Sequence, residues 1–137
     1  MKRKRIFIPL IPVALFAMIW TGCEKDYNYI APEVVINPNV EVSYSKDIQP
    51  IWNSGGCSVS GCHDGANYDP DLTAGNSYAA LFNIGNVDTV DAENSIIYKR
   101  VVLPPSDKKF MPKGGSPLSA TETALILEWI KQGAKDN

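Results

Sequence analysis

Two cysteines and the single histidine of the chain stand together in GGCSVSGCHDG, residues 55–65, as Cys57, Cys62 and His63. Thiols and an imidazole in this pattern could bind a zinc ion, form a disulfide or attach a haem. A structural zinc ion needs four ligands, and no second pair of cysteines or histidines is available. A Cys57–Cys62 disulfide forms readily in an oxidising compartment, but it gives the position of His63 no role.

Covalent haem is the interpretation that uses all three residues. The pattern C-x-x-C-H attaches haem c through two thioethers, and its histidine binds the iron. Here four residues, not two, separate Cys57 from Cys62. On a helix these cysteines would stand about 140° apart instead of about 60°. Both can reach one haem only if SVSG loops outward, and Gly61 and the Gly55–Gly56 pair supply the backbone freedom for that.

Met111 offers an independent check, because a haem iron has a second axial position. It is the only methionine after residue 18 and lies 48 residues beyond His63. Phe110 and Pro112 flank it in the irregular stretch FMPKGG, where a core-filling methionine is less expected. Thioether sulfur opposite imidazole is the axial pair that suits electron transfer.

Short helices joined by irregular loops are predicted to position these residues. The first spans residues 45–54, with Ser45 or Asp47 as its cap. It places three apolar side chains on one face: Ile48, Ile51 and Trp52. Two further short helices are predicted over residues 74–83 and 91–102; in the second, Ile96, Ile97, Arg100 and Val101 fall in phase.

The last helix, over residues 119–133, has the clearest pattern. Ser119 and Glu122 have capping-box spacing, and Gly133 is a typical C-terminal stop. Its apolar stripe comprises Leu125, Ile126, Trp129 and Ile130. Residues 103–117 hold four prolines and two glycines and are predicted to form an extended loop. No comparable strand alternation is present, so the predicted fold is small and all-α.

The first 22 residues have the pattern of a signal peptide: a basic start, an apolar segment and small residues before Cys23. The sequence TGC resembles the lipobox of bacterial lipoproteins, which implies that Cys23 is lipidated; Trp20 departs from the usual leucine. The alternative is an uncleaved N-terminal membrane anchor. We expect residues 23–43 to be a flexible tether with a reach on the order of 25 Å. The domain is then residues 44–137.

Charge narrows the range of partners. Loss of the signal peptide leaves nine of the 13 basic residues against all 15 acidic ones, a net charge of about −6. An acidic domain has no electrostatic reason to bind nucleic acid. The expected partners are therefore proteins, together with the membrane that holds the lipid.

The domain resembles a short class I-type cytochrome c, the single-haem domain found in bacterial lipoproteins. The segments that carry the resemblance are YSKDIQPIW, CHDG, NSIIYKRV and MPKGGSPLSATETALILEWIKQGA, and together they cover about residues 44–135. The resemblance implies one haem c attached at Cys57 and Cys62, with His63 and Met111 as axial iron ligands. It also implies that the first and last helices cross beside the haem, with Ile51 and Trp52 meeting Trp129 and Ile130.

A His/Met-ligated iron leaves no open position for a substrate, whereas one-electron transfer needs none. The expected function is therefore a membrane-tethered electron carrier between redox partner proteins, and not an enzyme. An enzyme would require displacement of Met111. The expected location is the bacterial cell envelope, facing the periplasm or on the outer membrane. The alternative is a haem-free lipoprotein interaction module tied by a Cys57–Cys62 disulfide.

Overall fold

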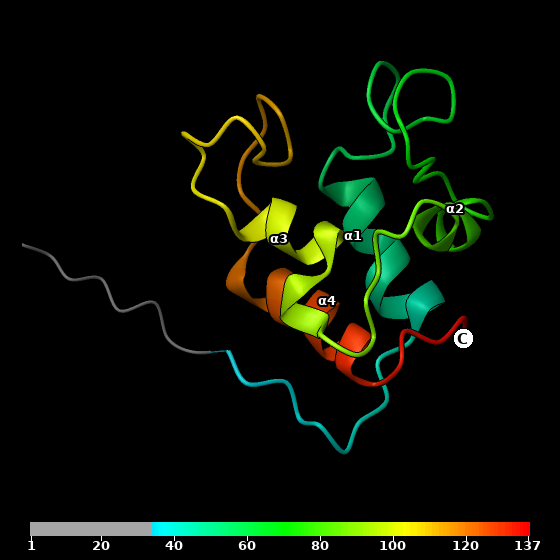
Figure 1. The fold of residues 1–137 in the computed structure, drawn as a ribbon, viewed down its shortest axis with the longest axis vertical. Helices are drawn as coiled ribbons and strands as arrows, with labels where there is room; N and C mark the ends of the chain where they lie inside the picture. Colours follow the sequence, from blue (N-terminus) through cyan, green and yellow to red (C-terminus); the bar gives the residue numbers. More distant parts are fainter. Residues whose placement is uncertain (1–33) are drawn as a thin grey trace, which may run out of the picture. The chain divides into compact units, whose positions relative to one another are not determined.

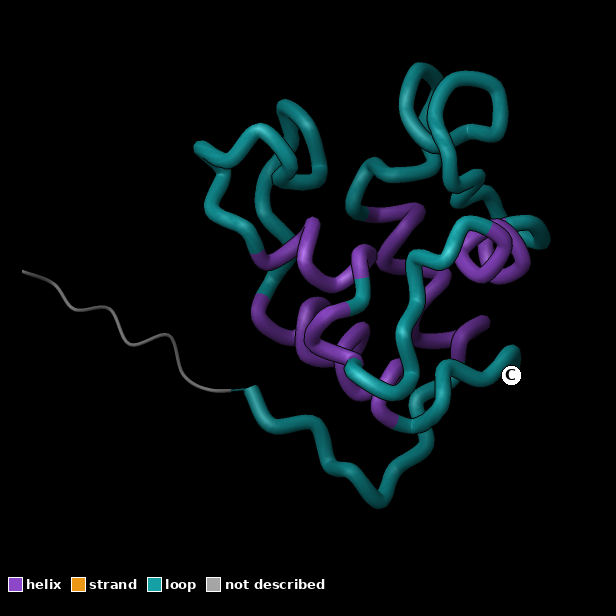
Figure 2. The backbone as a smooth tube through the Cα atoms, viewed as in Figure 1, coloured by secondary structure: helices purple, strands orange, loops and turns teal. Residues whose placement is uncertain are grey.

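The computed structural model describes residues 34–137, which contain six helical segments and no strand (Figures 1 and 2). The all-α prediction is confirmed for this part of the chain. Among its helices, none combines the length and the apolar character needed to cross a membrane.

The first helical segment begins as a turn of π-helix, η1 (Tyr44–Ile48), and continues as α1 (Gln49–Ser54). Its N-cap is Ser43, whose hydroxyl accepts a hydrogen bond from the Lys46 backbone N–H at 3.3 Å. The Asp47 carboxylate reaches back to the Ser43 N–H at 2.8 Å. The predicted N-cap position, Ser45 or Asp47, was therefore wrong, because the N-cap is Ser43. Asp47 contributes by accepting the Ser43 N–H in return.

The middle helices are shorter than the sequence pattern predicts. They are α2 (Ser77–Asn83), the 3₁₀ turn η2 (Ala92–Asn94) and α3 (Ile96–Val102). Ser95 interrupts the predicted 91–102 helix, because its buried hydroxyl accepts from the Asp88 N–H at 2.8 Å and donates to the Asp88 carbonyl at 3.1 Å. Ile97 and Val101 are buried as predicted, but Ile96 is 45% exposed.

The last helix, α4 (Ala120–Lys131), matches its prediction closely. Ser119 and Glu122 form a complete capping box, and Gly133 adopts a φ of 94° just beyond the helix. Ile126, Trp129 and Ile130 are fully buried, which makes this face of α4 one wall of the core.

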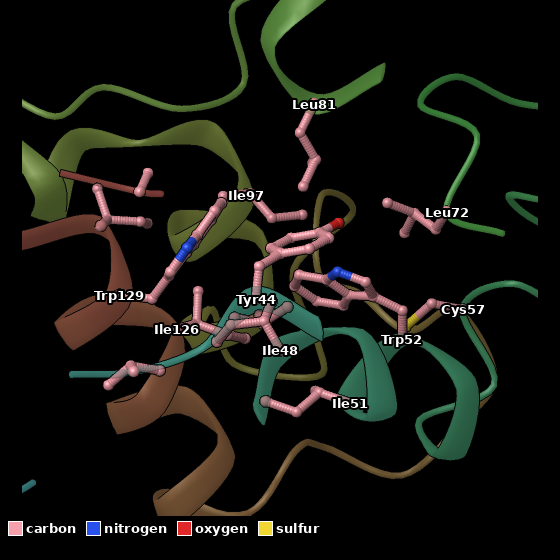
Figure 3. Packing of buried hydrophobic residues seen from close by; sticks show 14 of the residues in the cluster. Tyr44, Ile48, Ile51, Trp52, Cys57, Leu72, Leu81, Ile97, Ile126 and Trp129 are labelled. Carbon is pink, nitrogen blue, oxygen red and sulfur yellow. The ribbon is translucent and has the colours of Figure 1, made fainter. Parts of the chain in front are cut away.

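The core lies where the first and last helices meet (Figure 3). The Tyr44 and Trp129 rings have centroids 5.1 Å apart, so η1 makes the contact with α4. The crossing was predicted further along, at Ile51 and Trp52. Both of these are buried, but Trp52 lies between Tyr44 and Cys57 instead.

Two long loops stand at the same end of the longest axis of this unit, above the helices in Figure 1. One follows α1 and carries His63, and the other follows α3 and carries Met111. Residues 34–43 run along the opposite, lower side of the helices. There the Val42 N–H donates to the Gln132 side chain at 2.8 Å and the Ser45 N–H to the Asn137 carbonyl at 2.9 Å.

Candidate functional site

The segment from Cys57 to His63 forms a closed loop. The His63 N–H donates to the Cys57 carbonyl at 3.0 Å, and the Cys62 N–H donates to the Val59 carbonyl at 3.0 Å. Gly61, at a φ of 84°, supplies the turn that L side chains rarely adopt. The residues between the cysteines therefore bulge outward, and the backbone of His63 is bonded to that of Cys57 at the base of the bulge.

The half-buried imidazole of His63 is oriented by a backbone carbonyl. Its Nδ1 lies 3.1 Å from the Pro70 carbonyl oxygen, which can only accept, so Nδ1 carries the proton. In the neutral imidazole Nε2 is then the nitrogen without a proton, and it has no hydrogen-bond partner in the described chain. A histidine that binds a metal through one nitrogen usually donates the other N–H to such an oxygen.

A buried polar network ties this loop to the helices. The Tyr44 hydroxyl donates to Ser77 Oγ at 2.6 Å, and Ser77 Oγ donates to Gln49 Oε1. Gln49 Nε2 in turn donates to the Leu72 carbonyl at 3.2 Å, while the Leu72 N–H donates to the His63 carbonyl at 2.8 Å. The backbone position of His63 is therefore held by side chains from η1, α1 and α2.

The two cysteines differ in environment. Both thiols are free, with Cys57 9% exposed and Cys62 half-buried. Burial raises the pKa of Cys57 to about 11, and the nearby charges of Cys62 and Glu122 add to the shift. In the folded domain Cys57 is thus a protonated, weakly nucleophilic thiol, and only Cys62 is open to solvent.

Met111 lies in the second loop, where its neighbours hold it in place. Phe110 and Pro112 on either side are buried, and the Met111 N–H donates to the Arg100 carbonyl at 2.9 Å. The Arg100 guanidinium also donates to the Lys109 carbonyl at 3.2 Å. The half-buried methionine is therefore tied to the end of α3 despite its irregular backbone.

The bases of the two loops touch. Leu118 packs so closely on Gly55 that a Cβ added there would lie 3.0 Å from the leucine Cδ2. Cys57 lies near enough to Glu122, at the start of α4, to feel its charge. No hydrogen bond links Met111 to Cys57, Cys62 or His63, so the contact between the two loops is made by other residues at their bases.

An unsatisfied hydrogen-bond donor on Trp52 bears on whether the site suits a bound group. Its indole Nε1 is buried and has no hydrogen-bond partner, the one such side-chain atom in residues 34–137. The Tyr44 hydroxyl lies near it without completing a hydrogen bond. Burial raises the pKa of this tyrosine, and Ser77 and Trp52 oppose the shift. An unsatisfied buried donor costs on the order of 1–3 kcal/mol, so an acceptor such as a haem carboxylate would suit this atom.

Sequence reasoning missed Pro70 and the Ser77–Gln49 pair, and it treated Trp52 only as an apolar core residue. The only available signal was DPDL, three residues after CHDG, because its Pro70 has a carbonyl but no N–H of its own. Cys23, the predicted lipidation site, lies outside the described residues. Within residues 34–137, no group of three or more His, Cys, Asp or Glu side chains is placed to hold a metal ion.

Comparisons with known proteins add nothing to this geometry. No family model matches the chain, and no curated protein and no solved structure matches it.

Proposed function

We propose that the chain is a monohaem c-type cytochrome that carries single electrons between redox partner proteins while tethered to a membrane. The observation that carries the proposal is the His63 imidazole, whose Nδ1 proton is donated to the Pro70 carbonyl at 3.1 Å. In the neutral ring that contact leaves the lone pair on Nε2, and the two cysteines of the same loop are free thiols. A disulfide-tied module has no use for a histidine held in this way.

The residues divide the work of holding the haem. Cys62 and Cys57 would form the thioethers, each by adding its S–H across a vinyl group, and His63 Nε2 and Met111 would bind the iron. The haem supplies a centre that gains and loses one electron. The chain excludes water with buried Phe110, Leu72 and Trp52, and offers Trp52 Nε1 as a donor to a carboxylate. With both axial positions filled, the site has no place for a substrate.

The tether serves the same function. Cys23 would carry the lipid, and the tether before Val40, where the chain is bonded to Gln132, would let the domain move about a bacterial envelope membrane to meet its redox partners.

A pyridine haemochrome spectrum of the full chain, expressed with its signal in a bacterium that attaches haem c, tests the proposal. A spectrum of thioether-linked haem that resists acid–acetone extraction is expected. The alternative module predicts no haem band and no free thiol at Cys57 or Cys62 under non-reducing conditions. A haem-free protein whose two cysteines form a disulfide would overturn the proposal.

A further inference from the structure

The two loops at the functional end carry opposite charge. The acidic lobe, within residues 57–75, contains Asp64, Asp69 and Asp71 and no basic residue, a net charge of −3. The basic lobe, within residues 100–113, contains Arg100, Lys108, Lys109 and Lys113 and one acidic residue, Asp107, a net charge of +3. Equal and opposite lobes therefore stand at one end of an acidic chain (Figure 1).

Neither lobe is neutralised within the described chain. The two ion pairs of residues 34–137 lie elsewhere, Lys131–Glu93 at 3.6 Å and Lys135–Glu41 at 2.7 Å. Lys108, Lys109 and Lys113 are all exposed. Asp71 stays ionised at neutral pH, because hydrogen bonds from Thr73 lower its pKa. Both lobes therefore present their charge to whatever meets this end of the domain.

We propose that this end is a self-complementary docking surface for a second copy of the chain. A two-fold rotation places the acidic lobe of each copy against the basic lobe of the other, which is the isologous arrangement of most homodimers. A uniformly acidic partner would meet the basic lobe but be repelled by Asp64, Asp69 and Asp71. A uniformly basic partner would meet the acidic lobe but be repelled by the basic lobe. The pattern therefore favours a partner that carries both an acidic and a basic lobe.

The association is weak and depends on salt. Exposed charges are screened beyond about 8 Å at 0.15 M ionic strength but reach about 30 Å at 0.01 M. One consequence of the dimer rests on the proposed function. If each copy holds a haem, the dimer brings the two His63–Met111 sites face to face. Electrons can then pass between copies of the protein as well as to other partners.

Zero-length carbodiimide cross-linking, which joins lysine to carboxylate, tests the dimer directly. Full chain purified in non-ionic detergent is prepared in light and ¹⁵N-labelled forms and mixed at low protein-to-micelle ratio. Mixed-isotope links from Lys108, Lys109 or Lys113 to Asp64, Asp69 or Asp71 are expected at 10 mM salt. Their yield should fall about tenfold or more at 0.5 M salt. Absence of such links, or links that persist at high salt, would overturn the proposal.

Charge exchange gives a second, constructive test. The basic-lobe variant Lys108→Glu/Lys109→Glu/Lys113→Glu has two acidic lobes. The acidic-lobe variant Asp64→Asn/Asp69→Lys/Asp71→Asn keeps side-chain oxygens at 64 and 71, which accept hydrogen bonds from Asn67 and Thr73. Each variant alone should lose the dimer, and an equal mixture should form heterodimers by sedimentation velocity. A mixture that stays monomeric, although each variant keeps the wild-type circular dichroism spectrum, would refute the two-fold arrangement.

Lys46→Glu provides the matched control. Lys46 is exposed on η1, away from both loops, and its substitution changes the net charge as much as Lys109→Glu. Only Lys109→Glu should reduce cross-linking; equal reductions would mean that total charge, and not the lobes, governs association. Because cross-linking does not require haem and the haemochrome spectrum does not require a dimer, failure of one proposal is distinguishable from failure of the other.

Discussion

His63 Nδ1 and the Pro70 carbonyl oxygen lie 3.1 Å apart, and this contact decides which nitrogen of the imidazole can act as a ligand. A carbonyl has no proton to give, so in the neutral imidazole the proton resides on Nδ1 and the lone pair on Nε2. The contact also opposes ring rotation. Under the proposed function, this arrangement would present Nε2 of the only histidine of the chain to the iron.

Loss of the ligand or of the adjacent thiol should abolish the holoprotein. His63→Ala and Cys62→Ala are expected to yield no stable haem protein, because the iron loses its axial base or the haem its accessible thioether. Cys57→Ala should retain haem through the single thioether at Cys62. The haemochrome spectrum and haem-to-protein ratio measure this. Ser60→Ala, an exposed change in the same loop, is the control; wild-type spectra for all three site variants would show that the site is misassigned.

Met111→Ala should open the second axial position. We expect the reduced variant to bind carbon monoxide readily while the wild type binds it poorly, and the reduction potential to fall because thioether sulfur favours ferrous iron. Met111→His restores a ligand and should suppress carbon monoxide binding again. Difference spectra of the reduced proteins report the result, and indistinguishable binding in wild type and Met111→Ala would remove Met111 from the site.

The two thiols should react at very different rates in the haem-free domain. Raising the pKa of Cys57 from 9.0 to about 11 lowers its thiolate fraction about 100-fold at pH 8, in addition to its burial. Iodoacetamide should therefore label Cys62 first, and labelling of Cys57 should accelerate as the pH rises toward 11. In denaturant both should react alike. Equal labelling of the two thiols in the folded domain at pH 8 would contradict the buried position of Cys57.

Ser77→Ala should destabilise the domain by about 1–3 kcal/mol, because it leaves the buried Tyr44 hydroxyl and the Gln49 side chain without partners. Urea unfolding followed by circular dichroism measures the change. Ser106→Ala, in an exposed loop, should stay within about 0.5 kcal/mol of wild type. A similarly small effect at Ser77 would mean that water replaces the lost hydroxyl.

Cys23→Ser tests the anchor. Three acyl chains, as in bacterial lipoproteins, exceed the two signals that stable anchoring needs. The variant should either remain unprocessed on its signal or appear as a soluble form, seen by detergent phase partitioning and by the mass of the N-terminal peptide. Partitioning into detergent with a processed N-terminus, as in wild type, would argue against lipidation.

Local signals made α4 predictable. Its capping box, apolar stripe and terminal glycine all lie within residues 119–133, and each depends only on neighbours in sequence. The outward bulge between Cys57 and Cys62 also followed from spacing and from Gly61. In each case the information needed for the prediction was contained in fewer than 20 residues.

The errors occurred where distant contacts decide the structure. Ser95 ends one helix and starts another because Asp88 lies beside it in the fold, although the apolar pattern runs straight through. Trp52 turns toward Cys57 and leaves the contact with Trp129 to Tyr44, a choice made by the packing of η1 on α4. The sequence also gives no sign that Trp52 Nε1 is buried without a hydrogen-bond partner among residues 34–137.

The bonds between residues 40–45 and the end of the chain determine how the domain responds to force. A pull on the segment before Val40 acts first on the Gln132 side chain, which holds Val42 N–H at 2.8 Å and the Val40 carbonyl at 3.0 Å. It acts next on Asn137, whose carbonyl accepts from Ser45 N–H at 2.9 Å. The load therefore passes into residues 132–137, after α4, and these bonds involve neither of the loops that carry His63 and Met111. A tether drawn taut would break these bonds one after another while His63 and Met111 kept their places.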